Sequence, residues 1–481
     1  MVSCRELSGH KEAVVSLDCV KDRSSLNGNL LASSSEDKTA RLWDVRTERS
    51  VRWLSDPSLS SDSMGHVRLH PREPVVILAH GDELLVYDLR QSASILLKAP
   101  SHKVSLGGMS ETGTRQQVAV SSTDDEDDVP FTVNDFIFNP ADLNTVVCPT
   151  DCGHVLVVDW KKPEVVTRWT NGHKNICQCV AGRVWSSDGL AGGESDRAIV
   201  EILSGGMDSQ VCRWDPRSKK FRGKLQMGKL LSEYGGGGMD EALNAGKMVN
   251  PPFVMDLEVT EIGDAILFGL GNGAIGMMRY QGDRLEASPC FIGETHTSAV
   301  AALAIVPSTE RQEAEAEGGS AEILPNPFSL SVFSAGCDQE LILWRDEASI
   351  NAALAAQAEA TAEERKDSSS SASSSSAVSS SEVTGQASAS ADADAQGHPA
   401  EAADGETGGK SAPGTKKKSG KQKRAPPRSL RVARKVSLPE KPNCLAVWGN
   451  EKLCLGDLSS TIKVLDIREL MMMESDGPRG K

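Results

Sequence analysis

The segment SEDKTARLWDVR, residues 35–46, has the form of the end of a repeat unit. Its first four residues are polar and favour a tight turn, and the next four alternate between polar and apolar side chains, as in a half-buried β-strand. A Trp-Asp pair, Trp43 and Asp44, closes the strand, and Arg46 follows two residues after the aspartate. Recurrence of such a unit at fixed spacing would predict a repeat architecture for the whole chain.

The pattern recurs twice with the same inner spacing. A serine lies four residues before the aspartate of the turn, a tryptophan lies six residues after it, and a histidine lies upstream. The three sets are His10, Ser33, Asp37 and Trp43; His173, Ser204, Asp208 and Trp214; and His296, Ser334, Asp338 and Trp344. In each set the carboxylate can accept a hydrogen bond from the imidazole, and the hydroxyl can bond both the imidazole and the indole. We therefore expect a structural chain of hydrogen bonds, because these polar groups would be costly to bury unpaired.

The three sets resemble the WD repeat, which implies four-stranded units arranged as the blades of a β-propeller. Weaker units fill the gaps at residues 66–90, 131–160, 252–280 and 443–466, each with alternating strands around a polar or glycine turn. The last unit ends after its third strand, at Asp466, so we expect Val2–Leu7 to supply the missing outer strand and close the ring. The predicted fold is an all-β, seven-bladed WD-repeat β-propeller with a long disordered insertion before the last blade.

The domain boundaries follow from composition. Residues 1–345 are predicted to hold blades 1 to 6, residues 346–428 a disordered low-complexity insertion, residues 429–470 the last strand of blade 6 and blade 7, and residues 471–481 a disordered tail. The insertion ends in a basic run that includes Lys416, Lys417, Lys418, Lys421, Lys423 and Arg424. Such a run is either a solvated tail or a signal for nuclear import or for an anionic partner.

Charge and hydropathy restrict the partners and the compartment. The chain has a net charge of -15, which argues against broad nucleic-acid binding, so we expect only a weak contact of this kind, through the basic run. No apolar run has the length of a membrane span, and the N-terminus lacks the apolar core of a signal peptide. We therefore expect no membrane partner and a location in the nucleus, the cytoplasm or both.

We expect no catalytic residue, cofactor or metal. Cys148, Cys152 and His154, with Cys177 and Cys179, have a tolerable spacing for zinc, but the last two lie in an alternating strand, where cysteine commonly fills the core. The His, Ser and Asp sets have the composition of a hydrolytic triad. They occur three times, however, whereas a nucleophile sits once, in a cleft beside an oxyanion site.

An arginine follows the Trp-Asp pair in two of the complete sets. Arg46 follows Asp44, and Arg217 follows Asp215, each after one intervening residue. One hypothesis is a surface arginine that pairs with its aspartate or caps the turn. The other comes from a resemblance, because W-D-x-R is similar to the motif of WD-repeat substrate receptors of cullin–RING ubiquitin ligases, where this arginine helps to bind a large propeller adaptor. Asp44, Arg46, Asp215 and Arg217 are therefore the candidate adaptor-binding residues.

A wider resemblance covers most of the chain. The segments NGHKNICQCV (171–180), ILSGGMDSQVCRWD (202–215), VNPPFVMDLEV (249–259) and THTSAVAALAIVP (295–307), a basic insertion, and the last blade (438–467) follow the order of the WD repeat-containing protein 53 family. That resemblance implies a non-enzymatic scaffold that serves as a substrate receptor of a cullin–RING ligase. The alternative is a general WD-repeat scaffold in a nuclear complex, of chromatin or ribosome assembly, without a ligase. A monomeric propeller is expected within either complex, since a closed ring leaves few free strand edges.

Overall fold

A computed structural model describes residues 4–20, 25, 27–59, 64–91, 94–107, 131–185, 198–234, 250–286, 290–292, 296–306, 330–346, 430–449 and 451–472. These residues belong to one compact unit, Met1–Ala352 with Arg428–Lys481. The predicted disordered insertion and its basic run from Lys416 to Arg424 lie outside the described residues, as does the tail after Met472. Within the described part of the chain, no helix has the length and hydrophobicity needed to cross a membrane.

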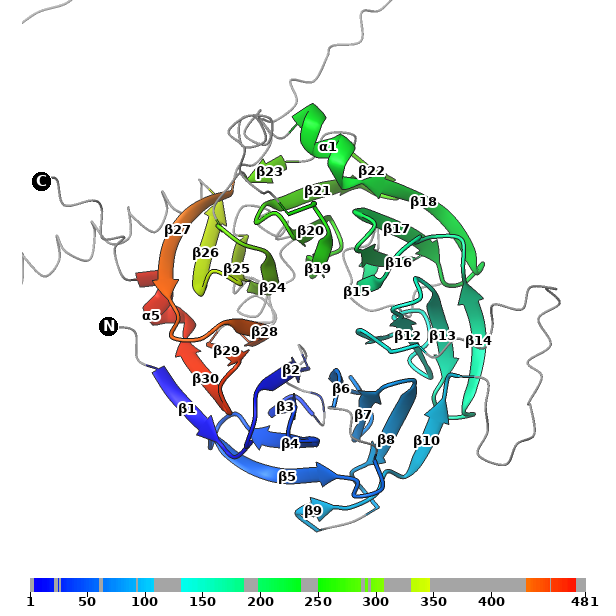
Figure 1. Cartoon of the computed structure of the whole chain (residues 1–481), viewed down its shortest axis with the longest axis vertical. Coiled ribbons are helices and arrows are strands. Elements are labelled where there is room, and N and C mark those ends of the chain that lie inside the picture. The colour runs from blue at the N-terminus through cyan, green and yellow to red at the C-terminus, as the bar shows by residue number, and fades with distance from the viewer. Residues whose placement is uncertain are drawn as a thin grey trace, which may run out of the picture. The chain divides into compact units, whose positions relative to one another are not determined.

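Seven sheets stand in a ring around a central axis, and each has an inner strand near the axis and an outer strand at the rim (Figure 1). Blade 1 contains β2 (Val14–Cys19), β3 (Leu30–Ser35), β4 (Thr39–Asp44) and β5 (Arg49–Ser55). Blade 2 contains β6 (Val67–Leu69), β7 (Val75–His80), β8 (Glu83–Asp88) and β10 (His102–Ser105). Blade 3 contains β11 (Ile137–Phe138), β12 (Thr145–Pro149), β13 (Val155–Asp159) and β14 (Glu164–Trp169). Blade 4 contains β15 (Cys177–Trp185), β16 (Ile199–Gly206), β17 (Gln210–Asp215) and β18 (Lys220–Gln226).

The remaining blades complete the seven-bladed propeller that the sequence predicts. Blade 5 contains β19 (Val254–Val259), β20 (Ala265–Leu270) and β21 (Ile275–Gln281), and both β22 (Arg284–Leu285) and β23 (Cys290–Ile292) pair with β21. Blade 6 contains β24 (Val300–Val306), β25 (Ser331–Gly336), β26 (Glu340–Asp346) and β27 (Leu430–Ser437). Blade 7 contains β28 (Pro442–Trp448), β29 (Lys452–Asp457), β30 (Thr461–Asp466) and β1 (Cys4–Ser8).

Two blades join segments that are far apart in the sequence. In blade 7, β1 pairs with β30 in antiparallel register from Cys4↔Leu465 to Ser8↔Thr461, which confirms the predicted closure by the N-terminal strand. In blade 6, β27 pairs with β26 from Glu340↔Ser437 to Asp346↔Leu430, so the outer strand of this blade follows the insertion. Blades 6 and 7 are therefore each completed by a strand that is distant in the sequence from the other three strands of the blade.

Apolar and polar contacts both connect neighbouring blades. Trp43 of blade 1 packs in a buried cluster with Leu7 and Ile462 of blade 7. Around the axis, a carboxylate on the inner segment of one blade accepts a backbone N–H from the inner strand of the next. These bonds join Asp18 to Leu69 (2.7 Å), Asp135 to Val180 (3.3 Å) and Asp256 to Leu303 (2.6 Å).

Three short elements were not predicted. The helix α1 (Met227–Tyr234) follows blade 4, and β9 (Leu96–Leu97), from the segment between β8 and β10 of blade 2, pairs in parallel with β5 of blade 1. The helix α5 (Ile467–Met472) corrects the boundary of the predicted disordered tail, because it continues through Met471 and Met472. It is helical there because Ile467 and Leu470 are buried against blades 6 and 7.

Candidate functional site

The structure brings together each of the three predicted sets of His, Ser, Asp and Trp, which we call tetrads. In blade 1, His10 Nδ1 lies 3.1 Å from Asp37 Oδ2, His10 Nε2 lies 2.8 Å from Ser33 Oγ, and Trp43 Nε1 donates to the same hydroxyl at 2.8 Å. The corresponding distances are 3.0, 2.9 and 2.8 Å in blade 4 and 3.0, 2.8 and 2.8 Å in blade 6. Each tetrad ties a loop before its blade to the second and third strands.

The tetrads share the Asp–His–Ser order of hydrogen bonds with a hydrolytic triad but differ from it in the surroundings of the serine. The three serines are 0% exposed, and each hydroxyl is engaged by both the imidazole and the indole. The aspartate also accepts a backbone N–H from the residue after the histidine, as Asp208 does from Lys174 at 3.0 Å. Burial alone would raise the pKa of Asp208, but the hydrogen bonds from His173 and from this amide outweigh it and hold the pKa below its ordinary value.

One group of described residues gathers three ligand atoms that could hold a metal ion, and it overlaps a tetrad. The ligand atoms of His296, Asp338 and Glu340 lie within 4.8 Å of one another. Both ring nitrogens of His296 are already used, however, by Asp338 and Ser334, so the imidazole has no free lone pair to offer. The cysteines considered for zinc do not form such a group: Cys148, Cys177 and Cys179 are buried in strands, and Cys152 lies exposed on a turn.

An aspartate at the end of the third strand caps a turn in five consecutive blades, and in blades 1 and 4 it follows the tetrad tryptophan. In blades 7, 1, 2, 3 and 4, the aspartate that ends the third strand accepts the backbone N–H of the residue two positions later, at 2.8 to 3.0 Å. These pairs are Asp466 with Arg468, Asp44 with Arg46, Asp88 with Arg90, Asp159 with Lys161, and Asp215 with Arg217. In blades 1 to 4 the capped turn leads from the third strand toward the outer strand, and in blade 7 it leads into α5. We call the face of the ring that bears these turns the turn face. The third strand of blade 6, β26, ends at Asp346 and thus ends at the same face.

The two W-D-x-R arginines use their side chains differently. Arg46 forms a two-point contact with Asp44, with Nη2–Oδ2 at 3.0 Å and Nε–Oδ1 at 3.3 Å, and its side chain is 61% exposed. Arg90 forms the same contact with Asp88, at 2.7 and 2.9 Å, although a tyrosine precedes that aspartate. Arg217 instead donates to the carbonyl of Ala198 at 2.7 Å, and Asp215 pairs with Arg222. Of the two parts of the first hypothesis, the side chain of Arg46 shows local pairing with its aspartate, whereas Arg217 takes part only in the turn cap, through its backbone N–H.

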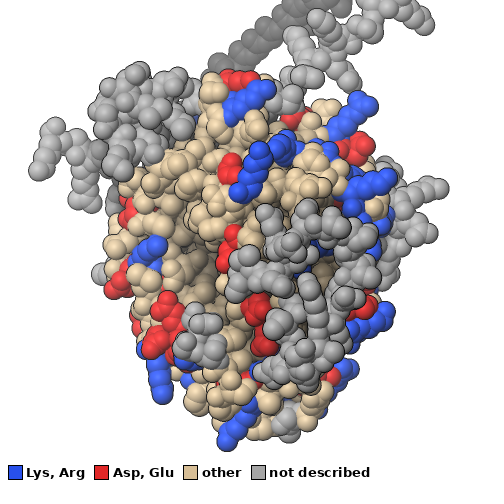
Figure 2. Space-filling model, turned by 45° about the vertical axis from the view of Figure 1, so that its right-hand side comes forward, with Lys and Arg blue, Asp and Glu red and all other residues tan. Residues whose placement is uncertain are grey.

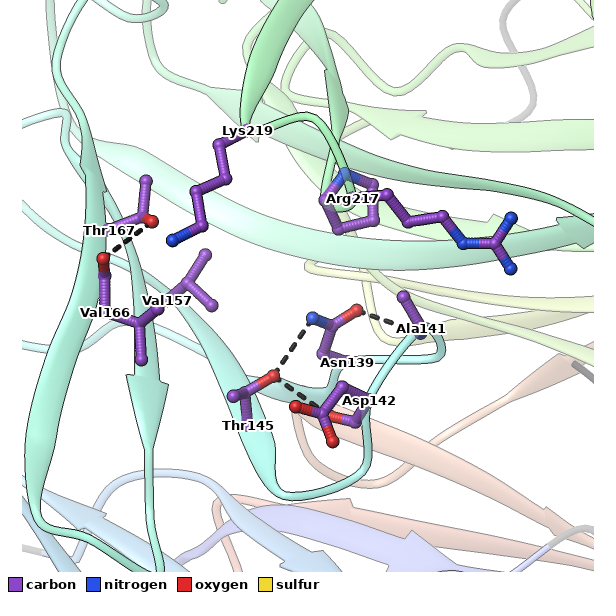
Figure 3. A pocket seen from close by; sticks show the side chains of 10 residues that line it. Asn139, Ala141, Asp142, Thr145, Val157, Val166, Thr167, Arg217 and Lys219 are labelled. Atoms are coloured by element: carbon purple, nitrogen blue, oxygen red, sulfur yellow. Dashed lines mark hydrogen bonds between the residues drawn. The ribbon is translucent and has the colours of Figure 1, made fainter. Parts of the chain in front are cut away.

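Arg217 also lines a cavity of about 190 Å³ between blades 3 and 4 (Figure 3). The turn of blade 4 supplies Pro216, Arg217 and Lys219, and blade 3 supplies the opposite walls. Arg46 lies in blade 1 and Arg217 in blade 4, so the two motifs do not form one contiguous patch (Figure 1). Arg90, in contrast, lies in the blade next to that of Arg46.

The architecture and the tetrads agree with a comparison of the sequence with known families. The model of the WD domain, G-beta repeat family matches residues 1–44, which contain the whole first tetrad. The chain is a WD-repeat β-propeller. As such, it has the architecture of a family whose members are generally protein-interaction scaffolds rather than enzymes.

Two relatives of this WD-repeat propeller were found. WD repeat-containing protein 53 homolog of Dictyostelium discoideum is 21% identical over 274 residues, which cover 56% of this chain and 63% of that protein. Restriction of telomere capping protein 1 of Clavispora lusitaniae (strain ATCC 42720) is 34% identical over 97 residues, which cover 19% of this chain and 8% of that protein. The chain thus spans less than two thirds of the length of either relative. The first relative bears the name of the family that the sequence segments resemble.

The sequence did not predict a buried charged network between blades 4 and 5. Arg183 is fully buried and donates to the carbonyls of Gly263 and Gly282, both at 2.6 Å. Glu201, also fully buried, accepts from Arg213 at 2.8 Å and from the hydroxyl of Tyr280 at 2.7 Å. Met278 takes the register position that tryptophan has in the tetrad blades, and Tyr280 lies two residues later. The network therefore connects blade 4 to a blade that has no tetrad of its own.

Proposed function

We propose that this WD-repeat propeller is a substrate receptor that docks on the adaptor of a cullin–RING ubiquitin ligase and presents a protein substrate to it. The observation that carries the proposal is the exposed Arg46 of a complete W-D-x-R segment on the turn face. The relation to WD repeat-containing protein 53 homolog supports it, because the segments that resemble this family imply the same role. We propose no catalytic activity, metal or cofactor for the chain itself.

The local pair of Arg46 is compatible with docking. The Arg46–Asp44 pair is exposed, so water and salt screen it and an incoming partner can take over the guanidinium with little loss. Arginine suits the task because its planar fork can bond two acceptors at once, which lysine cannot do. Arg217 is held by the carbonyl of Ala198, and we therefore assign the main contact to Arg46. Asp44 and Asp215 serve as caps that hold the two turns in place.

The test is the recovery of a purified cullin-ligase adaptor by the wild-type chain and by Arg46→Ala, Arg217→Ala and the double variant. Arg46→Ala should weaken binding by about 2 kcal/mol or more, roughly 30-fold, if the arginine is a hot spot. Arg46→Lys should recover little of this loss. Arg90→Ala is the matched control, because Arg90 makes the same local contact, is 62% exposed and lacks the preceding tryptophan. Equal recovery by all variants, or none by the wild type, would leave the ligase proposal without support.

The alternative is a general assembly scaffold in a nuclear complex, of chromatin or ribosome biogenesis, without a ligase. The basic run from Lys416 to Arg424 favours it, since such runs serve nuclear import and contacts with anionic partners. Replacing these basic residues with glutamine and locating the protein by fluorescence separates the two. A shift from nucleus to cytoplasm with unchanged adaptor recovery would assign the run to import alone. Loss of all nuclear partners with no adaptor bound by the wild type would favour the scaffold.

A further inference from the structure

We propose that the cavity between blades 3 and 4 anchors an acidic side chain from an extended segment of a partner protein. The cavity lies beside the turn of blade 4, and its volume of about 190 Å³ suits a single side chain (Figure 3). This site goes beyond the ligase proposal, because its ligand contact is Lys219 and not the arginine that we assign to the adaptor.

The floor of the cavity is fixed by hydrogen bonds within blade 3. Asn139 Nδ2 donates to Thr145 Oγ1 at 3.0 Å, and this hydroxyl donates to the carbonyl of Asp142 at 2.9 Å. Asn139 and Thr145 are both buried. Because these groups bond one another, they hold the shape of the cavity without needing a ligand, and a partner pays no cost to order them.

Lys219 supplies the charge that a ligand would meet. Its ammonium has no hydrogen bond or ion pair with any described residue, and in Figure 3 its side chain extends toward the wall that carries Thr167. Its backbone is held in place, with φ at 56° and the carbonyl accepting from Trp169 Nε1 at 3.3 Å. Trp169 in turn stacks on Trp214 of the blade 4 tetrad, with the two ring centroids 4.9 Å apart. The backbone of Lys219 is therefore fixed by packed aromatic side chains, while its ammonium group is free to meet a ligand.

The remaining walls select the kind of side chain. Val157 and Val166 offer apolar surface beside Lys219, which suits the methylene groups of a glutamate. The exposed carboxylate of Asp142 stands at the cavity too, where it repels a second negative group. A bound carboxylate is thus favoured near Lys219 and away from Asp142, which orients the side chain.

Further lysines follow Lys219 on blade 4, whereas the whole chain is acidic. The outer strand of blade 4 adds the exposed Lys220 and Lys224, which have no ion pair with any described residue. Figure 2, which brings this side of the ring forward, shows lysine and arginine side chains interspersed with aspartate and glutamate on the right-hand part of the molecule. The chain has a net charge of -15 in spite of its basic run from Lys416 to Arg424, so these lysines stand out against an acidic background. Charge complementarity therefore favours an acidic segment over a basic or neutral one.

The experiment measures the fluorescence anisotropy of a labelled Glu-Ser repeat peptide titrated with the full chain. The Gln-Ser counterpart tests the need for charge. Binding of the glutamate peptide should weaken about tenfold or more in Lys219→Glu and should change less than about twofold in the matched control Lys441→Glu, an exposed lysine of blade 7. Ala141→Phe, which fills the cavity without changing charge, should weaken binding as strongly, and Lys219→Gln should weaken it to an intermediate extent.

Three outcomes would overturn the proposal. Equal losses in Lys219→Glu and Lys441→Glu would reduce the effect to non-specific attraction. Full binding by Ala141→Phe, with a melting curve like that of the wild type, would show that the cavity is not used. Equal binding of the Gln-Ser and Glu-Ser peptides would show that the carboxylate does not contribute to binding. The adaptor does not take part in this assay, so its result is separate from that of the ligase proposal.

Discussion

At the scale of single residues, the tetrads show how a few buried polar groups connect loops to strands. In blade 4, Asp208→Ala would leave the Nδ1 of His173 and the amide of Lys174 without their acceptor. We expect a loss of about 1–3 kcal/mol in the free energy of unfolding, with the fold unchanged. The control is Asp283→Ala, which removes an exposed carboxylate from a turn of blade 5.

The stabilisation by Asp208 also depends on pH. Because the folded protein holds the pKa of Asp208 below its ordinary value, its contribution is fully present above the unfolded pKa of about 4 and is lost as the pH falls through the folded pKa. The difference in stability between wild type and Asp208→Ala should therefore be constant near pH 7 and shrink below about pH 4. Denaturant unfolding at several pH values checks this, and a difference that grows on acidification would contradict it.

Cys152 is the residue for which we predict unusual reactivity. Its partial burial, which opposes ionisation, is outweighed by hydrogen bonds from His154 and Thr150, which lower the pKa of Cys152 to about 7. The hydroxyl of Thr150 lies 3.0 Å from the sulfur. Cys4 is also exposed, but burial of its thiol and the nearby Glu6 raise its pKa, so it serves as an internal control.

The rate of alkylation of the native protein by iodoacetamide should therefore be half-maximal near pH 7 at Cys152, because the thiolate is the nucleophile. His154→Ala should move the midpoint toward the ordinary value of about 8.5. Peptide mapping by mass spectrometry assigns each modified cysteine. Faster modification of Cys4 than of Cys152 at pH 7 would show that the turn does not activate the thiol.

At the scale of elements, the outer strand of blade 7 comes from the opposite end of the chain. Deleting residues 1–7 removes most of β1 and, with it, Leu7, which is 4% exposed and packs with Trp43 of blade 1. Truncation of a buried leucine alone costs about 2–5 kcal/mol, so we expect the melting temperature to fall by several degrees. Removing residues 473–481 instead is the control, and an unchanged melting curve in the first deletion would contradict the role of β1.

The strands and their contacts also show which structural features can be predicted from the sequence. The blades with tetrads are predictable because His, Ser, Asp and Trp recur at fixed spacing, and β1 follows from the strand missing after Asp466. The network of Arg183 and Glu201 was not predictable, since its partners Gly263 and Tyr280 follow no repeated spacing. The contact of Arg217 with the carbonyl of Ala198 was missed for a related reason, because the identical motif around Arg46 makes a different bond.

At the scale of the whole molecule, the insertion separates two parts of the sequence whose strands belong to the same ring of blades. The composition of Ser368–Ala412 predicts a segment that cannot bury enough apolar surface to offset its chain entropy, so a protease should cut it first. The fragment after the cut would carry β27, the three strands β28, β29 and β30, and the helix α5. The fragment before it would carry everything else, including β1.

These two fragments should remain bound to each other, because each completes a blade of the other. The longer fragment contributes three strands to blade 6 and receives β27 from the shorter one, which in turn receives β1 in blade 7. Buried clusters also cross the cut, with Phe333 packed in one cluster with Leu455, and Trp43 in another with Ile462. The nicked protein should elute from a native size-exclusion column as one species and separate into two only in denaturant. The same nick in the chain that lacks residues 1–7 should release part of the shorter fragment, since one of the two exchanged strands is gone. Separation of the fragments without denaturant in the otherwise intact chain would mean that the exchanged strands do not hold the ring together.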